Sequence, residues 1–301
     1  MSNLHSYPSI YNLGHKAVRE IFSHPFRVQE KVDGSQFSFA LIDGQLRTRS
    51  KGQEFAPEYP PDMFKLACEQ VMDRKKLLHP GWIYRGEYLN KPKHNALEYG
   101  RVPLGNVILF DIDRGVEDYL DQDELNEEAN RLNLECVPLY TLPTPVDAEM
   151  LHQLLDTPSC LGSKYIEGFV IKSCALYGSD KKTLMAKHVS ERFKEVHSTI
   201  TYGAGARKIG ITQLLIERYK NPNRWLKAIQ HLREAGMIQD APQDIGPLIK
   251  EIPKDIEKEC KEEIMIELYK HIWPDIARGC VAGFPEWYKD QLLERQFANE
   301  T

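Results

Sequence analysis

Long apolar runs are missing from this sequence, and none of its runs approaches the ~20 residues of a membrane-spanning helix. Its first residues lack the basic and apolar regions of a signal peptide, so we expect a soluble, cytoplasmic protein with no membrane partner. The six cysteines include no CxxC pair, which argues against a zinc site or a small disulfide scaffold. The ten histidines include no HExxH motif, which removes the commonest metalloprotease signature.

A strong net charge is absent too. The 39 basic and 44 acidic residues give a net charge of −5, so the chain as a whole does not indicate a polyanionic partner. The distribution is uneven, because residues 181–233 hold twelve lysines and arginines against three acids, and residues 234–263 hold nine acids against four lysines. Either the two segments are solvated faces of opposite charge, or the basic segment belongs to a surface that binds nucleic acid.

Up to about residue 200 the pattern indicates short strands mixed with helices. Residues 35–42 alternate apolar and polar side chains, and Asp43-Gly44 favours a tight turn into a strand at 45–49. Further strands are expected at 26–31, 82–89, 107–112, 168–172 and 183–188, and helices at 61–78, 121–132 and 146–155. This order favours an α+β domain built on antiparallel sheets.

Beyond residue 201 the sequence is rich in helix formers and shows no alternating strand. The longest helix is expected at 255–273, and breaks are expected at Pro222, Gly236, Pro242, Pro247, Pro253, Pro274 and Pro285. The small residues of 201–206 indicate a hinge rather than a phosphate loop, because no strand leads into them and the third glycine of GxGxxG is missing. We therefore expect a first domain at 1–200, a hinge at 201–206 and an all-helical domain at 207–301.

The segment Glu30-Lys-Val-Asp-Gly-Ser35 holds the first chemically informative residues. Lys31 and Asp33 are two apart at the end of an expected strand, so their side chains project to the same side. Gly34 permits a sharp change of direction into the next strand. A lysine is thereby presented beside a carboxylate, although this short pattern alone is also compatible with a surface hairpin.

Five more motifs follow in order. They are RTRSK at 47–51, YRGEY at 84–88, VILFDI at 107–112, YIEGFVIK at 165–172 and LMAK at 184–187. Over residues 27–195 this ordered set resembles the covalent nucleotidyltransferases, which comprise polynucleotide ligases and mRNA capping enzymes. Phe110-Asp111, Phe193-Lys-Glu195 and the helical C-terminal part most resemble phage-type RNA ligases, especially the RNA ligase 2 (double-stranded RNA ligase) group. The resemblance implies an antiparallel-sheet nucleotidyltransferase domain, that is, an ATP-grasp-like ligase adenylation domain, followed by a smaller all-α domain.

The resemblance also implies an activity, namely ATP-dependent RNA ligation. AMP passes from ATP to Lys31 and then to a 5′-phosphate, which is finally joined to a 3′-OH. The implied cofactors are ATP and Mg²⁺ or Mn²⁺, the implied partners are RNA ends, and we expect a monomer. The implied catalytic residues are Lys31, Glu167 and Lys187. The residues implied to contact the nucleotide are Glu30, Lys31, Asp33, Arg49, Glu87, Phe110, Lys172 and Lys187, and those implied for the metal are Glu167 and Asp111.

The proposed nucleophile, Lys31, has to lose its proton before it can attack. A free lysine has a pKa near ~10.4, so almost all of it is charged at neutral pH. We expect metal ions and the cations Lys172 and Lys187 to lower this pKa. Phe110 is expected to stack on adenine, and the preference for ATP is expected to come from hydrogen bonds near Gln29–Glu30.

One departure concerns the last motif, which usually reads Lys-x-Lys but here has Met185 in the first position. Lys181 or Lys182 are the candidates to replace the missing cation. The residues expected to bind nucleic acid are Lys181, Lys182, Arg218, Lys220, Arg224 and Lys227. Two alternatives stay open: a ligase that also accepts DNA or RNA/DNA hybrid ends, and a catalytically weak relative that binds nucleic-acid ends.

Overall fold

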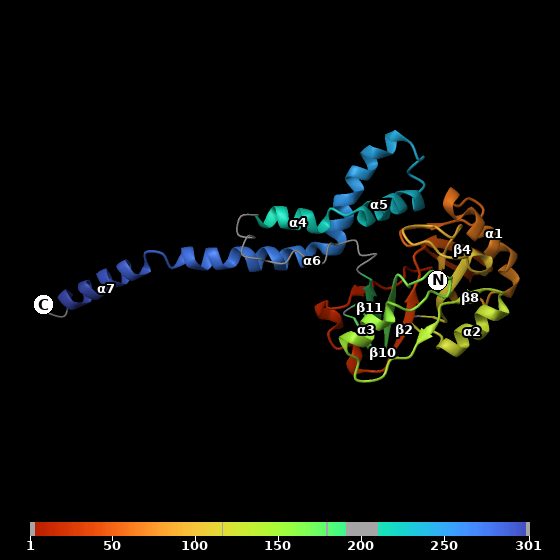
Figure 1. Ribbon diagram of the computed structural model, residues 1–301, viewed down its shortest axis with the longest axis horizontal. Helices are drawn as coiled ribbons and strands as arrows, with labels where there is room; N and C mark the ends of the chain where they lie inside the picture. Colours follow the sequence, from red (N-terminus) through yellow and green to blue (C-terminus); the bar gives the residue numbers. More distant parts are fainter. Residues whose placement is uncertain (1–3, 116, 179, 191–209, 299–301) are drawn as a thin grey trace.

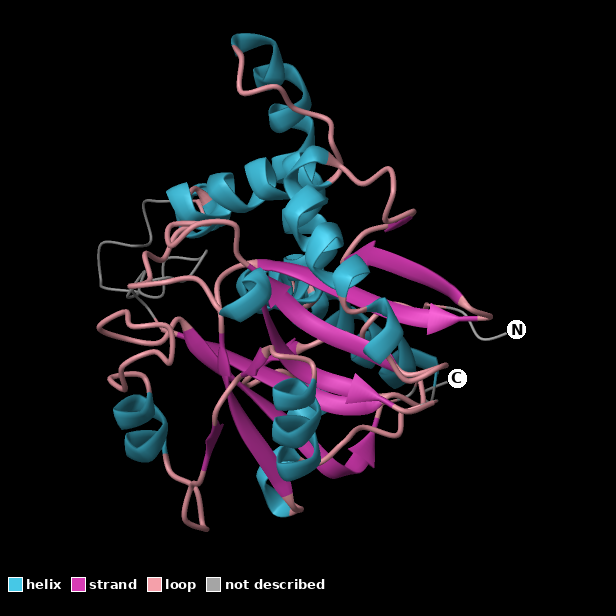
Figure 2. Cartoon of the chain, turned by 90° about the vertical axis from the view of Figure 1, so that its right-hand side faces the viewer, coloured by secondary structure: helices cyan, strands magenta, loops and turns pink. Residues whose placement is uncertain are grey.

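The computed structural model describes residues 4–115, 117–178, 180–190 and 210–298. Its strands form a five-stranded sheet of order β1-β11-β10-β2-β9 and a six-stranded sheet of order β5-β4-β3-β6-β7-β8 (Figure 2). Antiparallel pairs dominate, and among the named strands only β1–β11 and β7–β8 pair in parallel. The strands are β1 Tyr11–Asn12, β2 Phe26–Lys31, β3 Ser35–Ile42, β4 Gln45–Ser50, β5 Glu54–Phe55, β6 Ile83–Tyr88, β7 Val107–Asp113, β8 Glu135–Cys136, β9 Leu139–Tyr140, β10 Gly168–Tyr177 and β11 Thr183–Val189.

Three α-helices accompany the sheets, and every regular element described after residue 209 is a helix. The helices are α1 Lys65–Asp73, α2 Gln122–Arg131, α3 Ala148–Leu154, α4 Ile211–Tyr219, α5 Pro222–Glu234, α6 Ile245–Cys280 and α7 Phe284–Ala298. Short 3₁₀ turns lie between them, at Lys16–Val18, Ile21–Ser23, Asp62–Phe64, Lys75–Leu77, Leu104–Asn106 and Pro242–Asp244. The expected α+β class, with a helical C-terminal part, is confirmed.

Each sheet has its own apolar core on its outer face. Alternation within a strand sends every second side chain to one side. In β3, Phe37 and Phe39 are fully buried in a core that includes residues of α1 and α2. In the other sheet, Phe169 and Ile171 of β10 are buried in a core that includes Leu151 of α3. The remaining faces carry polar residues together with a small apolar cluster that includes Ala40 and Ile83, and they meet where Lys172 of β10 pairs with Asp111 of β7.

The C-terminal helices extend to one side of the sheets, and Figure 1 shows α6 and α7 running away from them. Helix α6 contains Pro253 and Pro274 in its interior, so the expectation of breaks there is wrong. An interior proline removes its own N–H bond and crowds the carbonyl four residues earlier, which favours a kink, but the long run of helix formers on both sides maintains the helix. The other expected breaks fall at helix ends or in the first turn, as at Pro222, the first residue of α5.

Most expected elements agree with the structure to within one or two residues, with three exceptions. Helix α6 is the longest helix, as expected, but it begins ten residues before and ends seven residues after the range expected for it, 255–273. The expected helix at 61–78 is divided into a 3₁₀ turn, α1 and another 3₁₀ turn, and β10 continues five residues beyond its expected end. Asp43 and Gly44 form the expected turn, with φ values of 50° and 75°.

The six cysteines are all free thiols. Within the described ranges, no helix is both long and apolar enough to cross a membrane. The expected hinge at 201–206 and the Phe193-Lys-Glu195 segment lie outside the described residues, so the division into two domains stays a prediction.

Candidate active site

Three of the predicted lysines lie on one face of the five-stranded sheet. Residues directly opposite each other on neighbouring strands point to the same side. Lys31 of β2 is opposite Gly168 of β10, and Lys187 of β11 is opposite Val170. Lys172, two residues further along β10, shares that face. The strand register thus gathers cations that are widely separated in the sequence.

The six-stranded sheet presents its own polar residues toward this face. Ser38 of β3 is opposite both Arg49 of β4 and Arg85 of β6, and Arg85 is opposite Asp111 of β7. The two sheets meet at an ion pair, since Lys172 Nζ lies 2.7 Å from Asp111 Oδ2. A shared interior surface therefore gathers Lys31, Lys172, Lys187, Arg49 and Asp111. Glu30, the neighbour of Lys31 on β2, points to the opposite face of its sheet.

The central contact of this surface joins Lys31 and Glu167. Lys31 ends β2, Glu167 directly precedes β10, and Lys31 Nζ lies 2.7 and 2.6 Å from the two carboxylate oxygens. Both side chains are mostly buried, with 27% and 11% of their surfaces exposed. The structure thus brings together the predicted nucleophile and the predicted metal carboxylate.

Three carboxylates keep Lys31 charged. Burial acts to lower its pKa, but Glu167, Asp33 and Glu87 outweigh this effect and raise the pKa above its ordinary value. The expectation that neighbouring lysines lower this pKa is wrong for this structure. The reason is geometric, because a carboxylate lies in direct contact with the ammonium group while another cation, Lys172, is neutralised by its own partner.

Two of the acids around Lys31, Glu87 and Glu167, have pKa values above the ordinary value of a glutamate. Burial raises the pKa of Glu87 to about 8, the Lys31 charge opposes this shift, and the carboxylates of Glu234, Glu167 and Asp33 add to it. Burial also raises the pKa of Glu167 to about 7, against the effect of Lys31. This cluster therefore exchanges protons near neutral pH, which is typical of sites that do chemistry.

Two predicted nucleotide-binding carboxylates have architectural partners in this structure. Asp33 Oδ2 accepts hydrogen bonds from the backbone N–H groups of Ala96 and Leu97, at 2.9 and 2.8 Å. Glu30 is buried and accepts a hydrogen bond from the backbone N–H of Cys160 at 3.0 Å. Both residues fix loops against the end of β2, and so hold Lys31 in place.

Asp111 and Phe110 are covered by a residue that the sequence analysis missed. The Tyr7 hydroxyl donates a hydrogen bond to Asp111, and the Tyr7 ring lies edge-on to Phe110 with 5.1 Å between centroids. Lys172 Nζ also donates to the Phe110 carbonyl at 2.8 Å. Asp111 thus pairs with Lys172 and Tyr7 and not with Glu167, the other predicted metal ligand. In the described ranges no three His, Cys, Asp or Glu side chains form a metal-binding group.

The N-terminal segment Leu4–Tyr7 occupies one end of the polar surface. Its main chain accepts hydrogen bonds from two arginines of the six-stranded sheet, since Arg49 Nη1 donates to the carbonyl of Leu4 at 2.9 Å and Arg85 Nη1 to that of His5 at 2.8 Å. These contacts use main-chain carbonyls, which any residue type supplies. No sequence pattern could therefore have revealed them.

Met185, the departure in the last motif, is fully buried on β11. It lies directly opposite Lys172 on β10, so a cation stands beside it on the same face. The two lysines expected to compensate lie in the preceding turn, where Lys181 is exposed and Lys182 Nζ lies 3.4 Å from the carbonyl of Ser6.

Helix α5 reaches the Lys31 motif from the C-terminal part of the chain. Gln230 Nε2 donates to the carbonyl of Gly34 at 2.7 Å and lies 3.2 Å from Ser35 Oγ. It also donates to Glu234, a buried carboxylate on the next turn. The sequence analysis missed this contact because nearly two hundred residues separate α5 from the motif.

The predicted nucleic-acid residues of the helical part do not form one exposed cationic face. Arg224 is almost fully buried, and its guanidinium pairs with Asp255 at 2.6 Å. Lys227 and Arg218 are also ion-paired with acids of α6. Lys220 is exposed at the end of α4.

The family model described as RNA ligase matches residues 24–194, more than half of the 301 residues. The chain therefore belongs to the RNA ligase family. No curated protein matches the sequence.

Solved structures of a Naegleria gruberi RNA ligase are similar to this chain. An apo mutant has 20% sequence identity and a TM-score of 0.48, and a mutant with ATP and Mn has 18% identity and a TM-score of 0.49. Each match covers 64% of this chain and 58% of the other. This chain thus matches less than two thirds of the length of those ligases.

Proposed function

We propose that this protein is an ATP-dependent RNA ligase that joins 3′-OH and 5′-phosphate ends through AMP bound to Lys31. The observation that carries the proposal is the mostly buried contact of Lys31 with Glu167, on a polar surface that two sheets build from widely separated motifs. Membership of the RNA ligase family supports it. The Phe110-Asp111 pair and the helical C-terminal part favour the RNA ligase 2 group.

The first step is an attack by Lys31 Nζ on the α-phosphorus of ATP. An N–P bond forms, the P–O bond to pyrophosphate breaks, and Lys31 loses a proton. Lys31 must first leave its ion pair with Glu167, because that contact stabilises the unreactive ammonium form. In the second step an oxygen of the RNA 5′-phosphate takes the AMP from Lys31, and in the third the 3′-OH displaces AMP.

Glu167 is the residue that best fits a divalent cation. It offers two carboxylate oxygens on the polar surface, and hard cations such as Mg²⁺ or Mn²⁺ prefer oxygen ligands. A bound cation would neutralise phosphate charge. Asp111 fits this role less well, because Lys172 and Tyr7 already engage it.

The surrounding residues suit a nucleotide. Arg49, Lys172 and Lys187 supply positive charge for phosphates, and we assign the ribose hydroxyls to Glu87 and the base to Phe110. Gln29 is buried on the Lys31 face, and in the described part of the chain its Oε1 has no hydrogen-bond partner. That oxygen can accept a hydrogen bond from the adenine amino group, which favours ATP over GTP.

We further propose that residues 1–200 carry the nucleotide chemistry and that 207–301, joined through a hinge at 201–206, help to hold RNA. Lys181, Lys182 and Lys220 are the best candidates for phosphate contacts, because they are less engaged by acids than Arg224 and Lys227. Ends of DNA or of RNA/DNA hybrids are a second substrate class to test, because none of these contacts reads a 2′-OH.

Incubation with α-labelled ATP and Mg²⁺, followed by denaturing electrophoresis, tests this function. The wild type should give a labelled band, and Lys31→Ala should give none but still seal a pre-adenylated strand slowly. Lys93→Ala, a change in a lysine outside the motifs, is the control and should label normally. An unlabelled wild type that binds RNA ends would instead support the non-catalytic alternative.

A further inference from the structure

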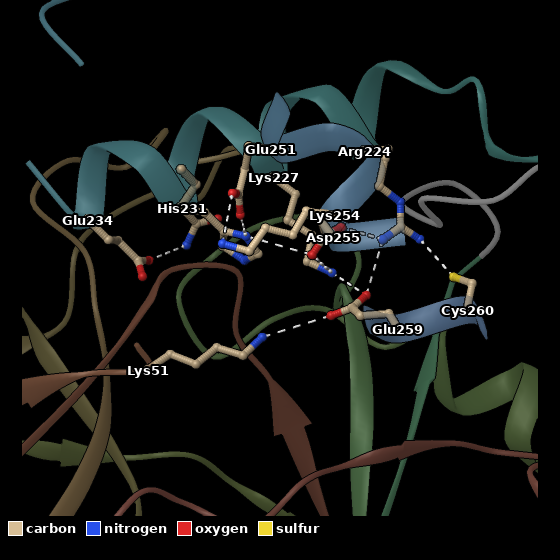
Figure 3. A network of polar contacts seen from close by, with 11 residues as sticks. Lys51, Arg224, Lys227, His231, Glu234, Glu251, Lys254, Asp255, Glu259 and Cys260 are labelled. Atoms are coloured by element: carbon tan, nitrogen blue, oxygen red, sulfur yellow. Dashed lines mark hydrogen bonds and ion pairs between the residues drawn. The ribbon is translucent and has the colours of Figure 1, made fainter. Parts of the chain in front are cut away.

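Glu259 of α6 bridges the helical part of the chain and the end of β4. Its Oε1 lies 3.9 Å from Nζ of Lys51, the residue directly after β4. Its Oε2 contacts Lys227 Nζ and lies 3.2 Å from Arg224 Nη1. Figure 3 shows this carboxylate between Lys51 on one side and the two cations of α5 on the other.

The surroundings of Glu259 strongly favour an anion. Burial alone would raise its pKa, but Lys227, Lys187 and Lys51 hold the pKa well below its ordinary range. Lys187 is one of the lysines that we assign to phosphate. The Glu259 carboxylate is therefore close to the place where phosphate charge is expected.

The network has a fixed part and an accessible part. Arg224 and Asp255 pair at 2.6 Å with only 2% of each side chain exposed, so this pair is structural. In contrast, 24% of Glu259 and 53% of Lys51 are exposed. If the Glu259 carboxylate moves away, Lys227 keeps a contact with Asp255 at 3.8 Å, whereas Lys51 has no other ion pair among the described residues.

We propose that Lys51 and Lys227 form a phosphate-binding subsite between β4 and α5, and that the Glu259 carboxylate occupies it until a phosphate group displaces it. A phosphate offers more negative charge and more acceptor oxygens than a carboxylate, so it can satisfy the same two cations. The assignment of phosphate as the ligand rests on the proposed function. Two sources carry this chemistry, namely the pyrophosphate released from ATP and a phosphate of RNA.

Direct binding measurements on the full chain, without ATP, test the subsite. The probes are inorganic pyrophosphate, a 5′-phosphorylated oligoribonucleotide and its 5′-hydroxyl counterpart. Glu259→Gln should bind at least one phosphate probe roughly two- to tenfold more tightly than wild type, the range expected when one partly exposed charge contact becomes available. Glu257→Gln is the matched control, because it removes the same charge from an exposed position on the same helix.

The arms of the experiment identify the source. If only pyrophosphate binds more tightly to Glu259→Gln than to wild type, the subsite holds the leaving group. If only the 5′-phosphorylated oligonucleotide does, the subsite holds the 5′ end of RNA. If both oligonucleotides gain affinity equally, the subsite holds a phosphate of the RNA backbone. Lys51→Gln in the Glu259→Gln protein should remove the gain. Equal affinities in Glu259→Gln, Glu257→Gln and wild type for all probes would overturn the proposal.

A second variant keeps the test decisive if Glu259→Gln unfolds. Lys51→Gln alone leaves no buried charge unpaired, and it should weaken binding of at least one of the phosphate probes roughly two- to tenfold relative to wild type. Unchanged binding by this variant would also overturn the subsite. None of the probes requires lysine adenylation. The binding results can therefore be interpreted even if the protein proves not to be an active ligase.

Discussion

The charge on Lys31 depends on the carboxylates that surround it. Burial favours the neutral amine that a nucleophile needs, whereas Glu167, Asp33 and Glu87 favour the ammonium form, and in this structure the carboxylates prevail. A ligase needs this balance to reverse once ATP binds. In the proposed mechanism, a divalent cation that accompanies the ATP phosphates would attract the Glu167 carboxylate and so release Lys31 from its ion pair.

Glu167→Gln should therefore lower the pKa of Lys31. Burial continues to lower this pKa in the variant, while the substitution removes the strongest of the contributions that raise it. Acylation of Lys31 by an amine-reactive reagent, followed by mass spectrometry across a pH series, should reach half-maximal rate at lower pH than in wild type. Glu127→Gln, at an exposed position of α2, serves as the control. An identical profile for Glu167→Gln would show that this ion pair does not govern Lys31.

Glu87 should make stability depend on pH. Its pKa is about 8 in the fold against an ordinary value of 4.5, so the folded state binds more protons than the unfolded state between these values. The stability it contributes is fully present below about pH 4.5 and is lost as the pH rises through about 8. In denaturant unfolding at several pH values, the free energy of unfolding of Glu87→Gln should fall less than that of wild type as the pH rises from about 4.5 to about 8. A fall equal to that of wild type would contradict this assignment.

At the scale of elements, local sequence patterns predicted those features that depend only on residues close together in the chain. The alternation of β3 and the Asp43-Gly44 turn are short-range features, and both have the expected form. The course of α6 through Pro253 and Pro274 could not be predicted in this way, because it depends on the helical context of the whole segment. The same holds for Leu4–Tyr7, whose position is set by contacts with side chains from distant strands.

Gly34 connects β2 and β3 at a point where no side chain fits. A Cβ atom there would lie 2.6 Å from the carbonyl oxygen of Tyr88 and 2.8 Å from Glu87 Cγ. Gly34→Ala should therefore lower the free energy of unfolding by about 1–3 kcal/mol and disturb the predicted ribose contact. Gly52→Ala is the control, since a Cβ there meets no atom within 4 Å. Equal denaturation midpoints in the two variants would rule out this steric constraint.

At the scale of the whole molecule, the site depends on contacts that join distant parts of the chain. Several residues of the ordered motifs lie on the facing surfaces of the two sheets, and strand register explains why residues from distant motifs meet there. The approach of α5 to Gly34 and of Glu259 to Lys51 could not be predicted, because no motif encodes how the helices pack against the sheets. Among the basic residues of 181–233 that the structure describes, Lys181 and Lys220 are exposed whereas Arg224 and Lys227 are ion-paired, which the number of charges in the segment does not reveal.

This separation predicts different outcomes for two sets of substitutions. Lys181 and Lys220 are exposed, so replacing both with Gln should weaken RNA binding. The slope of log affinity against log salt concentration should also become shallower, by up to about 0.7–0.9 for each phosphate interaction that the substitution removes. Arg224→Gln should leave the salt slope unchanged but destabilise the fold by about 3–5 kcal/mol, because it removes the cation that lies closest to the buried Asp255. The salt slope is measured from affinities for an RNA probe between 50 and 200 mM salt, about the range over which such interactions are resolved. Denaturant unfolding measures the change in stability. A reduced slope in Arg224→Gln and an unchanged slope in the double variant would show that RNA is held by Arg224 and not by the exposed lysines.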